Sequence, residues 1–546
     1  MDKTPFAISL APGTSRSDRT GSWRTERPVY VERRPPCSSG CPAGEDVRAW
    51  LGDAATDESG YERAWRTIME TNPFPAVMGR ICYHPCETAC NRGMLDEAVG
   101  INSVERFLGD RALDAGWQVT ARPATGRHVL VVGAGPSGLA AAYHLALLGH
   151  AVTVKEAASA AGGMMRFGIP AYRLPRAVLD AEIDRILDLG VTLELGEAVT
   201  DLGSTLSAGH YDAAFLAVGA QVSSRAYLPA GSAAHVLDAV ALLHDAAGTD
   251  PGPPALGRTV AVYGGGNTAI DAARSARRLG ATDAVVVYRR TRDQMPAHDS
   301  EVQEAEEEGI TFRWLSTIDH VHDGSLTLER MELDQDGFPQ PTGELEVLAA
   351  DSVVLALGQD TDLSLLSGFD GVTVRDGVVE VDGLQMTGRP GVFAGGDMVP
   401  GERSATTAVG AGRRAAGAVD AWLRGTGSTP TPVPPSADFA SLNTWYYEDA
   451  PRSHRARLEA VRRSSTFDEV VHGLDTETAQ YEARRCMSCG DCFSCDNCFA
   501  MCPDNAIVKL GMPGAPYAID LDYCKGCGLC ATECPAGAIE MVPEEI

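Results

Sequence analysis

The fifteen cysteines of this 546-residue chain form two groups at opposite ends of the sequence. Five lie between Cys37 and Cys90, ten lie between Cys486 and Cys534, and the long stretch between the groups contains none. A disulfide framework normally runs through one small domain and uses an even number of cysteines. The distribution therefore predicts metal sites at both ends, on either side of a separate catalytic body.

Two similar cysteine motifs lie near the C-terminus, and each ends in Cys-Pro. They are Cys492-x-x-Cys495-x-x-Cys498-x-x-x-Cys502-Pro503 and Cys524-x-x-Cys527-x-x-Cys530-x-x-x-Cys534-Pro535. In bacterial two-cluster ferredoxins, the fourth cysteine of each motif ligates the other cluster. We therefore expect one [4Fe-4S] cluster on Cys492, Cys495, Cys498 and Cys534, and another on Cys524, Cys527, Cys530 and Cys502. Zinc is the alternative, but zinc sites lack the terminal Cys-Pro and the interleaved ligands.

Cys486 and Cys489 continue the same three-residue spacing upstream of the first motif, so spacing alone leaves the register of the run ambiguous. The Cys502-Pro503 pair fixes the end of the ferredoxin motif. Cys486 and Cys489 then lie outside it, and the ferredoxin pattern has no role for these two thiols.

The centre of the chain contains two patterns typical of dinucleotide-binding βαβ units. The first, Gly133-x-Gly135-x-x-Gly138, lies between an apolar strand pattern at 128–132 and an alanine-rich helix pattern. Such glycines allow a tight turn and the close approach of a pyrophosphate to a helix N-terminus. Glu156 ends the next strand, where an acid binds a ribose hydroxyl. This pattern predicts an FAD site.

The second pattern is Gly264-x-Gly266-x-x-Ala269, with Asn267 at the start of the expected helix. The strand that follows ends in arginines instead of an acid: Arg289, Arg290 and Arg292. Arginine suits a 2′-phosphate, which a carboxylate would repel. We therefore predict NADP(H) at this site. NADH is the alternative, since the arginines could also belong to a solvated loop.

A third signal, Gly395-Gly396-Asp397, precedes a long helix pattern of small residues. Here the chain resembles the two-dinucleotide flavoprotein oxidoreductases. In that group the Asp bonds the flavin ribityl chain, and the helix that follows faces the isoalloxazine. Residues 213–220 and 351–360 resemble the crossovers by which the NAD(P) domain is inserted into the FAD domain. A disulfide reductase is disfavoured, because the centre has no redox CxxC.

The resemblance becomes narrower at "AGGMMRFGIPAYRLPRAVLDAEIDRILDLGV" (161–191), which contains Gly163, and at "VVYRRTRDQMPA" (286–297). Over about residues 37–425 the chain resembles the small (beta) subunit of NADPH-dependent glutamate synthase and its relatives. These include the NADPH-side part of dihydropyrimidine dehydrogenase and the large subunit of NADH-dependent ferredoxin:NADP oxidoreductase. The resemblance implies that Gly163 belongs to the cofactor-binding residues.

The same resemblance implies a helical N-terminal domain that carries two [4Fe-4S] clusters. In the family, one cluster takes a non-cysteine ligand from a helix, and "INSVERFLGD" (101–110) places Glu105 at that position. The resemblance thus assigns one cluster to Cys41, Cys82, Cys86 and Glu105. The alternative for Glu105 is a surface carboxylate on a helix, since thiolate is the usual ligand of iron–sulfur clusters.

Cys37 and Cys90 are then two thiolates short of a cluster, because the chain lacks the CxxC that begins this family's domain. Residues 465–490, which end in "RRCMSCG", resemble the segment that leads into that CxxC. We therefore predict that Cys486 and Cys489 join Cys37 and Cys90, which makes four [4Fe-4S] clusters in all. The alternative is that both are spare thiols beside the ferredoxin.

The expected fold is α/β, with a helical domain before the flavoprotein and an α+β ferredoxin domain after it. The expected segments are a polar tail (1–36), the helical iron–sulfur domain (37–122), the FAD domain (123–225 and 351–423), the NAD(P) domain (226–350), a Pro-rich linker (424–438), a helical connector (439–485) and the ferredoxin domain (486–546). The net charge of −28 argues against nucleic acid as a partner. Neither a bilayer-spanning apolar run nor a signal peptide is visible, so we expect a soluble cytoplasmic protein.

These parts predict a subunit that passes electrons between NAD(P)H and [4Fe-4S] clusters through FAD, with no acid–base catalytic residue required. Residues 519–545 resemble the delta subunit of 2-oxoacid:ferredoxin oxidoreductases. The expected partner in a hetero-oligomer is therefore a thiamine-dependent 2-oxoacid oxidoreductase. One alternative is a glutamate synthase small subunit with its large subunit as partner. Another is a non-catalytic iron–sulfur scaffold, although the intact glycines argue against it.

Overall fold

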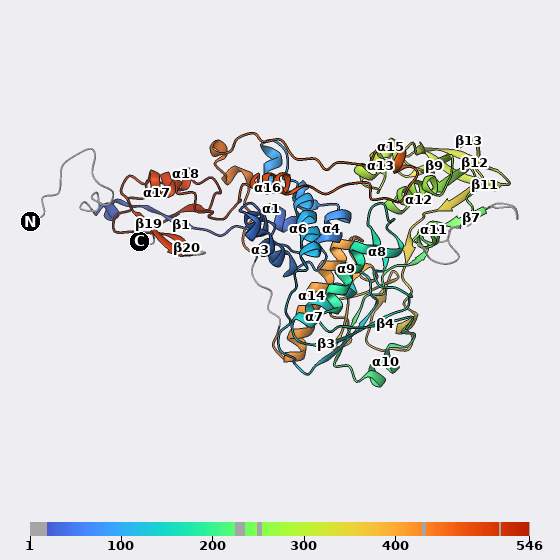
Figure 1. Ribbon diagram of the computed structural model, residues 1–546, viewed down its shortest axis with the longest axis horizontal. Helices are drawn as coiled ribbons and strands as arrows, with labels where there is room; N and C mark the ends of the chain where they lie inside the picture. Colours follow the sequence, from blue (N-terminus) through green and yellow to red (C-terminus); the bar gives the residue numbers. More distant parts are fainter. Residues whose placement is uncertain (1–18, 224–234, 248–253, 428–432, 513–514, 545–546) are drawn as a thin grey trace, which may run out of the picture.

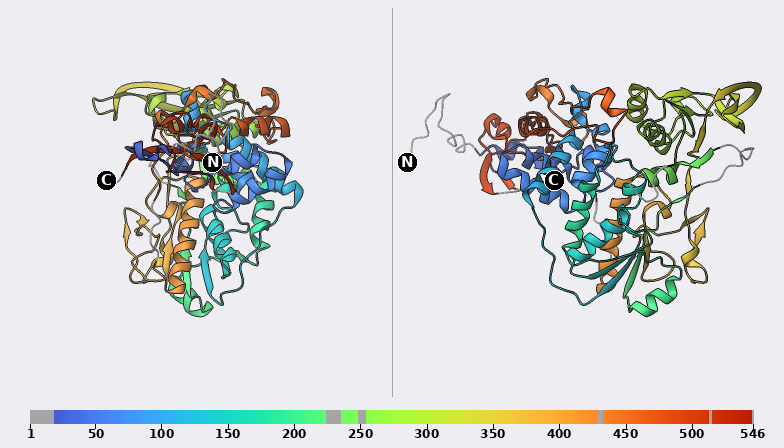
Figure 2. Two further views of the ribbon diagram at one scale, coloured as in Figure 1. Left: turned by 90° about the vertical axis from the view of Figure 1, so that its left-hand side faces the viewer. Right: turned by 45° about the vertical axis from the view of Figure 1, so that its right-hand side comes forward.

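The computed structural model describes residues 19–223, 235–247, 254–427, 433–512 and 515–544. The ferredoxin region and the NAD(P)-binding region lie at opposite ends of an elongated molecule, with the helical domain and the FAD-binding region between them (Figures 1 and 2). No helix within the described ranges has the length and apolar character needed to cross a bilayer.

The helical domain contains six helices: α1 (Pro36–Gly40), α2 (Val47–Ala54), α3 (Glu58–Met69), α4 (Pro75–Ile81), α5 (Pro85–Thr88) and α6 (Ile101–Ala115). Asp46 and Asp57 accept backbone hydrogen bonds at the N-termini of α2 and α3. Helices α4 and α6 cross closely because a glycine lies at each contact. A Cβ at Gly79 would lie 2.4 Å from Arg106 Cα, and one at Gly109 would lie 2.2 Å from Ala76 N.

The FAD-binding region is built on a parallel sheet in the order β18-β5-β2-β3-β4. Its strands are β2 (His128–Val132), β3 (Ala151–Glu156), β4 (Thr192–Leu195), β5 (Ala213–Leu216) and β18 (Val392–Ala394). The associated helices are α7 (Pro136–Leu147), α8 (Met164–Phe167), α9 (Arg176–Leu187), α10 (Leu202–Gly209) and α14 (Ala405–Arg424). Helices α7 and α14 pack together, and Gly412 allows the contact because its Cβ would lie 2.2 Å from Ser137 O.

The NAD(P)-binding region has a second parallel sheet, β10-β9-β8-β14-β7. Its elements are β7 (His235–Asp238), α11 (Ala239–Ala246), β8 (Thr259–Tyr263), α12 (Asn267–Arg278), β9 (Asp283–Val287), α13 (Asp299–Glu307), β10 (Thr311–Arg313) and β14 (Ser352–Leu355). An antiparallel meander of β11 (Ser316–His322), β12 (Ser325–Leu333) and β13 (Pro339–Ala349) follows β10.

The boundary predicted at residue 351 differs from the structure, because β14 pairs with β7 and β8 and so belongs to the NAD(P)-binding sheet. The chain crosses between the two regions through β6 (Val222–Ser223) and β15 (Gln359–Asp360), which pair with each other. A small hairpin of β16 (Val374–Arg375) and β17 (Val378–Val379) follows in the FAD-binding region. An apolar strand pattern does not reveal which sheet it joins, so the prediction placed β14 with the wrong sheet.

The predicted helical connector (439–485) is mostly extended. Its helices are α15 (Ala460–Arg463) and α16 (Thr476–Arg484), with short 3₁₀ turns at Phe439–Ser441 and Thr444–Tyr446. The rest is irregular and partly packed against other regions: Val470 N donates to Tyr172 O at 2.9 Å, and the Arg463 side chain forms an ion pair with Glu307 of α13 at 3.0 Å. Contacts with these surfaces replace the internal hydrogen bonds of a helix, so the helical prediction was wrong for most of the segment.

The two ends of the chain exchange segments. Strand β1 (Glu26–Tyr30) pairs antiparallel with β21 (Ile539–Pro543) in the ferredoxin module, whose other elements are α17 (Asn497–Met501), β19 (Ile507–Met512), β20 (Ala515–Ile519) and α18 (Leu529–Thr532). Conversely, α16 packs on α2 and α6 of the helical domain, and its Ala479 and Ala483 join that core. The tail predicted over 1–36 is therefore partly structured, although residues 1–18 lie outside the described residues.

Candidate functional site

A cleft of about 580 Å³ opens at the carboxyl ends of the FAD-region strands. Its lining includes these predicted cofactor-binding residues: Gly133, Gly135, Glu156, Gly163, Asn267 and Asp397. The glycines form a cradle that side chains would fill. Gly133 has a φ of +101° and its Cβ would lie 2.4 Å from Ala217 O, while a Cβ on Gly163 would lie 2.7 Å from Gly135 Cα. The lining therefore leaves room for a group that approaches the backbone closely.

The N-terminus of α7 faces this cleft through Gly135, Pro136 and Ser137. The Ser137 hydroxyl is buried and has no hydrogen-bond partner in the part of the chain that the structure describes. Glu156 is held at the end of β3, where its carboxylate accepts hydrogen bonds from Ala134 N at 2.6 Å and Ala158 N at 2.8 Å. Amides at a helix N-terminus, an orphaned hydroxyl and a fixed acid fit a dinucleotide with a pyrophosphate and a ribose.

Gly138 does not line the cleft. Its Cβ would lie 1.9 Å from Gly133 O, so Gly138 allows α7 to pack closely on the preceding turn. At the other end of the cleft, burial raises the pKa of Asp397, and Arg403 partly counters that effect. Ser404 caps α14 by accepting a hydrogen bond from Thr407 N at 3.2 Å. The N-terminus of α14 therefore faces the same cleft as α7.

The second glycine motif has the same local geometry. Gly264 has a φ of +153°, and its Cβ would lie 2.2 Å from Ala356 O. Gly266 is the N-cap residue of α12, and the side chain of Asn267 accepts a hydrogen bond from His298 N at 3.0 Å. Of this predicted set only Asn267 lines the large cleft.

The three predicted arginines follow the end of β9, next to this motif. Arg289 is exposed, and Arg290 is half-buried with no hydrogen-bond partner for its Nε. Arg292 forms an exposed ion pair with Glu306 at 2.6 Å. Within the described ranges, Arg289 and Arg290 form no ion pair with a carboxylate, which is compatible with binding a phosphate.

A contact beside the cleft joins three regions, and no sequence motif predicted it. The ring of Tyr83, in the helical domain, stacks on His298 of the NAD(P)-binding region, with 3.5 Å between ring centroids. Arg173, in the FAD-binding region, forms ion pairs with Asp271 at 2.8 Å and Glu301 at 2.6 Å. Tyr83 and Arg173 line the cleft. They carry no motif, because each acquires its neighbours only through the packing of separate domains.

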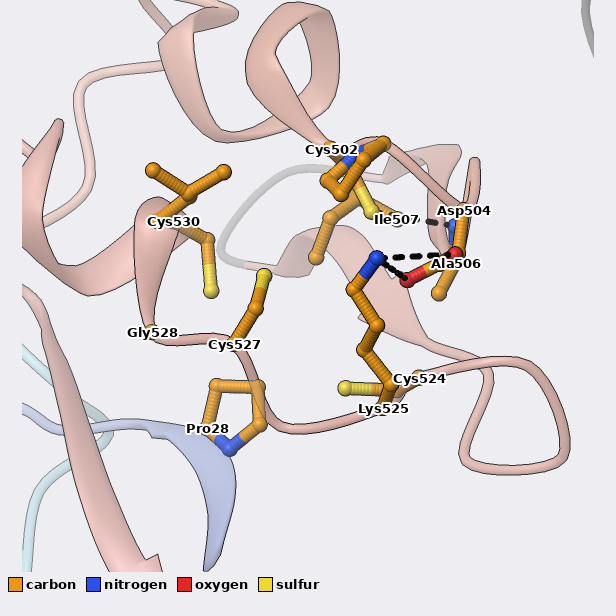
Figure 3. Close-up of a pocket in the computed structure, with 12 residues that line it drawn as sticks. Pro28, Cys502, Asp504, Ala506, Ile507, Cys524, Lys525, Cys527, Gly528 and Cys530 are labelled. Carbon is orange, nitrogen blue, oxygen red and sulfur yellow. Dashed lines mark hydrogen bonds and ion pairs between the residues drawn. The ribbon is translucent and has the colours of Figure 1, made fainter. Parts of the chain in front are cut away.

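The ferredoxin module brings together the two predicted sets of thiols. One pocket is lined by Cys502, Cys524, Cys527 and Cys530 (Figure 3). Another is lined by Cys492, Cys495, Cys498 and Cys534. The fourth cysteine of each motif therefore lies with the three cysteines of the other, as the interleaved pattern predicts.

A third pocket is lined by Cys37, Cys90, Cys486 and Cys489, which come from the two ends of the chain. The loop between Cys486 and Cys489 places Ser488 in the left-handed region, with a φ of +49°. The equivalent residues of the two ferredoxin loops do the same: Ser494 has a φ of +61° and Gly526 a φ of +73°. The loop thus has the backbone form of its ferredoxin counterparts, which favours the ligand prediction over spare thiols.

The remaining predicted set lies in the helical domain. Burial raises the pKa of the Cys86 thiol, and Cys41, Cys82 and Glu105 are close enough to raise it further. Glu105 is only 6% exposed, so it is not the surface carboxylate considered above. The side-chain amide of Asn72 donates to Glu105 and to Glu45, at 2.9 Å each. Glu45 is a second buried carboxylate at this site, and burial raises its pKa to about 7.

Among the described residues, no group of three or more His, Cys, Asp or Glu is arranged to hold a single metal ion. A zinc ion would draw its thiolates to about 2.3 Å from one centre. In three of the sets the cysteines instead line a pocket between them. The donor sets therefore fit iron–sulfur clusters better than zinc.

The four sets follow one another from the cleft to the tip of the ferredoxin module. Cys82 lies between Ile81 and Tyr83, which both line the cleft. Helix α1 joins Cys37 to Cys41, and α5 joins Cys86 to Cys90. Only Gly490 and Asp491 separate Cys489 from Cys492. Short covalent links thus connect each set to the next.

Comparison with protein families assigns the three parts of the chain independently. Residues 127–412 match the family described as pyridine nucleotide-disulphide oxidoreductase, which is just over half of the chain. Residues 24–117 match dihydropyrimidine dehydrogenase domain II, a 4Fe-4S domain. Residues 491–538 match the 4Fe-4S dicluster domain. Cys486 and Cys489 lie outside all three matched ranges.

Several curated proteins are similar over most of the chain. The beta subunit of an NADP(+)-dependent formate dehydrogenase from Moorella thermoacetica is 36% identical, over 83% of this chain and 70% of that protein. The beta subunit of an NADPH-Fe(3+) oxidoreductase from Geobacter sulfurreducens is 33% identical, over 83% and 75%. The small chain of an NADPH glutamate synthase from Azospirillum brasilense is 32% identical, over 73% and 88%.

Proposed function

Since the chain belongs to the pyridine nucleotide-disulphide oxidoreductase family, we propose that it carries electrons between NADP(H) and a partner subunit through FAD and four [4Fe-4S] clusters. The family matches make it an FAD-dependent NAD(P)H oxidoreductase with iron–sulfur domains, and its relatives are beta or small subunits. The single observation that carries the proposal is the continuous series of four donor sets leading away from the cleft.

In this proposal the cleft residues bind and orient FAD. The α7 N-terminus holds the pyrophosphate, Glu156 the ribose and Asp397 the ribityl chain. The α14 N-terminus faces the ring end of the cleft. Bound FAD supplies the exchange between two-electron hydride chemistry and one-electron transfer.

The chain's other residues position the nicotinamide and keep water out. Asn267 and the turn at Gly264 place the NADP(H) pyrophosphate at α12, and Arg289, Arg290 and Arg292 offer cations to a 2′-phosphate. The Tyr83–His298 stack and the ion pairs of Arg173 hold the NAD(P)-binding region against the cleft. No proton has to move through an acid–base side chain.

Cys82 is the ligand nearest to the FAD site in this proposal. Thr406, near the start of α14, donates a hydrogen bond to Met78 Sδ at 3.5 Å and is close enough to Cys82 to lower the pKa of its thiol, and Ala405 beside it lines the cleft. Clusters held by the four donor sets would then extend from this contact to the exposed thiols Cys495 and Cys527. These exposed thiols lie on the ferredoxin module, so we propose that the partner exchanges electrons with the chain there.

The partner we propose is a catalytic subunit that exchanges low-potential electrons. A thiamine-dependent 2-oxoacid oxidoreductase is supported by the ferredoxin sequence, and a formate dehydrogenase catalytic subunit is supported by the relative at 36% identity. Cysteines without disulfide bonds and the use of NADP(H) favour a cytoplasmic location. Copurification from the native host, followed by formate and 2-oxoacid oxidation assays with NADP⁺, separates the two candidates.

Anaerobic titration of the purified holoprotein with NADPH tests the proposal. We expect bleaching of the flavin absorbance, followed by cluster signals in electron paramagnetic resonance (EPR), and about sixteen irons per FAD for four clusters. A chain that keeps no flavin, or whose flavin does not respond to NADPH, would be the iron–sulfur scaffold considered above.

A further inference from the structure

The two halves of the ferredoxin module give their sulfur atoms the same backbone hydrogen bonds. Ala506 N donates to Cys502 Sγ at 3.2 Å, and Ala538 N donates to Cys534 Sγ at 3.3 Å. Each donor lies four residues after its cysteine in its own motif. On backbone contacts of this kind, the two cluster sites are equivalent.

Strand β1 breaks this equivalence, because two of its residues contact different sites. Pro28 lines the pocket of Cys502, Cys524, Cys527 and Cys530 (Figure 3), whereas Tyr30 lines the pocket of Cys492, Cys495, Cys498 and Cys534. The Tyr30 hydroxyl lies 3.4 Å from Cys498 Sγ. Proline has neither an amide hydrogen nor a hydroxyl to donate. One site therefore has a side-chain donor from β1, and the other does not.

The direction of the Tyr30 bond follows from the chemistry of its partners. A thiolate that ligates iron has no proton, so its sulfur can only accept, whereas a tyrosine hydroxyl is a good donor at neutral pH. The ring is also well fixed. Tyr30 pairs with Ile539 in the β1–β21 ladder, and its ring stacks on Tyr517 with 6.4 Å between centroids and 14° between planes.

We propose that Tyr30 raises the reduction potential of the first ferredoxin cluster by donating a hydrogen bond to Cys498. Hydrogen bonds to cluster sulfurs are among the factors that set these potentials. The bond is stronger when an added electron increases the negative charge on the sulfur. It therefore stabilises the reduced state relative to the oxidised state, and Tyr30 itself loses no proton.

This role rests on the proposed function and deepens it. The set that includes Cys492 follows the interdomain set directly, since only two residues separate Cys489 from Cys492. The set of Cys524, Cys527, Cys530 and Cys502 lies beyond it. A higher potential at the nearer cluster makes the transfer of an electron from the far cluster to the nearer one more favourable, so Tyr30 helps to hold an electron at the nearer cluster.

The test compares Tyr30→Phe with Tyr517→Phe in the full-length holoprotein. Tyr517 lines the same pocket, but its hydroxyl bonds to Asp496 instead of a sulfur. After iron counting, each protein is titrated with dithionite and mediators while EPR follows the clusters. We expect Tyr30→Phe to shift one midpoint potential to a more negative value and to leave the others in place, with no such shift in Tyr517→Phe. Unchanged midpoints in Tyr30→Phe, or equal shifts in both variants, would overturn the proposal.

A second measurement does not depend on the stability of any variant. In D₂O, pulsed EPR of the partly reduced wild-type protein should detect an exchangeable deuteron at hydroxyl distance from one ferredoxin cluster, in addition to the amide deuterons. Its absence would also overturn the proposal, whether or not Tyr30→Phe folds. Because dithionite supplies the electrons, neither experiment requires NADPH or flavin, and failure of the proposed function would appear separately.

Discussion

The helical domain and the ferredoxin module each pack against a segment from the opposite end of the chain, but the two segments contribute different groups. The helical domain receives α16 and the loop after it, which bring two thiols to the pocket of Cys37 and Cys90. The ferredoxin module receives β1, which brings strand pairing, a proline and a hydroxyl but no thiol. On the proposed ligand assignment, the first segment completes a cofactor site, whereas the second can change only how a complete site behaves.

The contacts that hold the two segments differ in the same way. On the α16 side they are buried charges: Arg485 forms ion pairs with Glu482 at 2.6 Å and Asp96 at 3.3 Å, and Glu482 accepts a hydrogen bond from Gly100 N at 2.6 Å. On the β1 side they include close backbone contacts, such as the one in which Gly526 touches the carbonyl of Glu26, together with ion pairs of Arg24 with Glu544 and of Arg33 with Glu540. The α16 side, where the charges are more deeply buried, should therefore respond most to changes of charge, and the β1 side should respond to changes of volume as well.

The largest expected effect comes from removing the thiols that α16 brings. Cys486→Ala/Cys489→Ala should lose one cluster, about a quarter of the iron on the four-cluster count. The gap in the series should slow NADPH-driven reduction of the ferredoxin clusters by at least about 100-fold, whereas flavin reduction keeps its rate. Iron analysis, stopped-flow absorbance and freeze-quench EPR measure the three quantities.

Ser488→Ala, in the same loop, serves as the matched control for this pair and should keep the full iron content. A double variant that retains about sixteen irons would show that Cys486 and Cys489 are spare thiols. In that case α16 and the loop after it would bring no ligand, and they would not differ from β1 in this respect.

A volume change on the β1 side should be the next largest. In Gly526→Ala the new Cβ would lie 2.2 Å from Glu26 O, at a φ of +73°. Strain and overpacking should together destabilise the module by about 3 kcal/mol. The iron content at room temperature should stay complete, and only the temperature at which cluster absorbance is lost should fall. Gly511→Ala has a φ of +66° and no atom within 4 Å, so it isolates the backbone contribution.

We expect both modules to receive electrons from one NADP(H) site. Reversing a charge at that site tests this expectation. Arg290→Glu should weaken NADPH binding by roughly 10- to 100-fold, since an Arg–phosphate contact is worth about 1.5–3 kcal/mol and 1.4 kcal/mol is tenfold. The reduction of all four clusters should slow together. NADH, which lacks the 2′-phosphate, should be affected much less. A variant in which only some clusters slow would reveal a second entry point.

The smallest effect concerns Asp96, which anchors the α16 side. Burial raises its pKa, but hydrogen bonds from Arg92 and from the amides of Ala450 and Glu97 lower it more, so the pKa is below its usual range. A depressed pKa gives stability that is present above the unfolded value near 4 and is lost as the pH falls through the folded value. Asp96→Asn should cost about 2 kcal/mol, constant from pH 5 to 8. Urea unfolding at several pH values measures this, and a cost that varied across the window would contradict it.

The sequence alone predicted the parts whose residues lie near one another in the chain. The FAD and NAD(P) fold and the 4Fe-4S domains are confirmed by the family matches. The glycine turns at Gly133 and Gly264 have the expected left-handed or near-left-handed backbone, because short motifs specify their own geometry. The ligand roles remain predictions, although the structure brings each set of thiols together.

Residues far apart in the chain left no readable pattern. Nothing in "ERPVY" identifies residues 539–543 as its partner, because strand pairing depends on exposed backbone groups that every sequence has. Tyr30, Tyr83 and Arg173 owe their roles to domain packing, and none belongs to a motif. Glu45 was also missed, because only the folding of the helical domain brings it close to Glu105. There the side-chain amide of Asn72 bonds to both carboxylates.

The exchange of ends also dictates an order of synthesis. On the proposed ligand assignment, the interdomain site takes Cys37, Cys90, Cys486 and Cys489, so it cannot be completed until almost the whole chain has left the ribosome. The first ferredoxin site needs Cys534 and is later still, although β1 was made among the first residues and must wait for β21. The helical domain is therefore synthesised first with only Cys37 and Cys90 of this site, before the two cysteines of the C-terminal segment are available. Truncation before Cys486 should therefore disable iron loading at both ends of the protein, whereas truncation just before Cys524 should affect only the ferredoxin module.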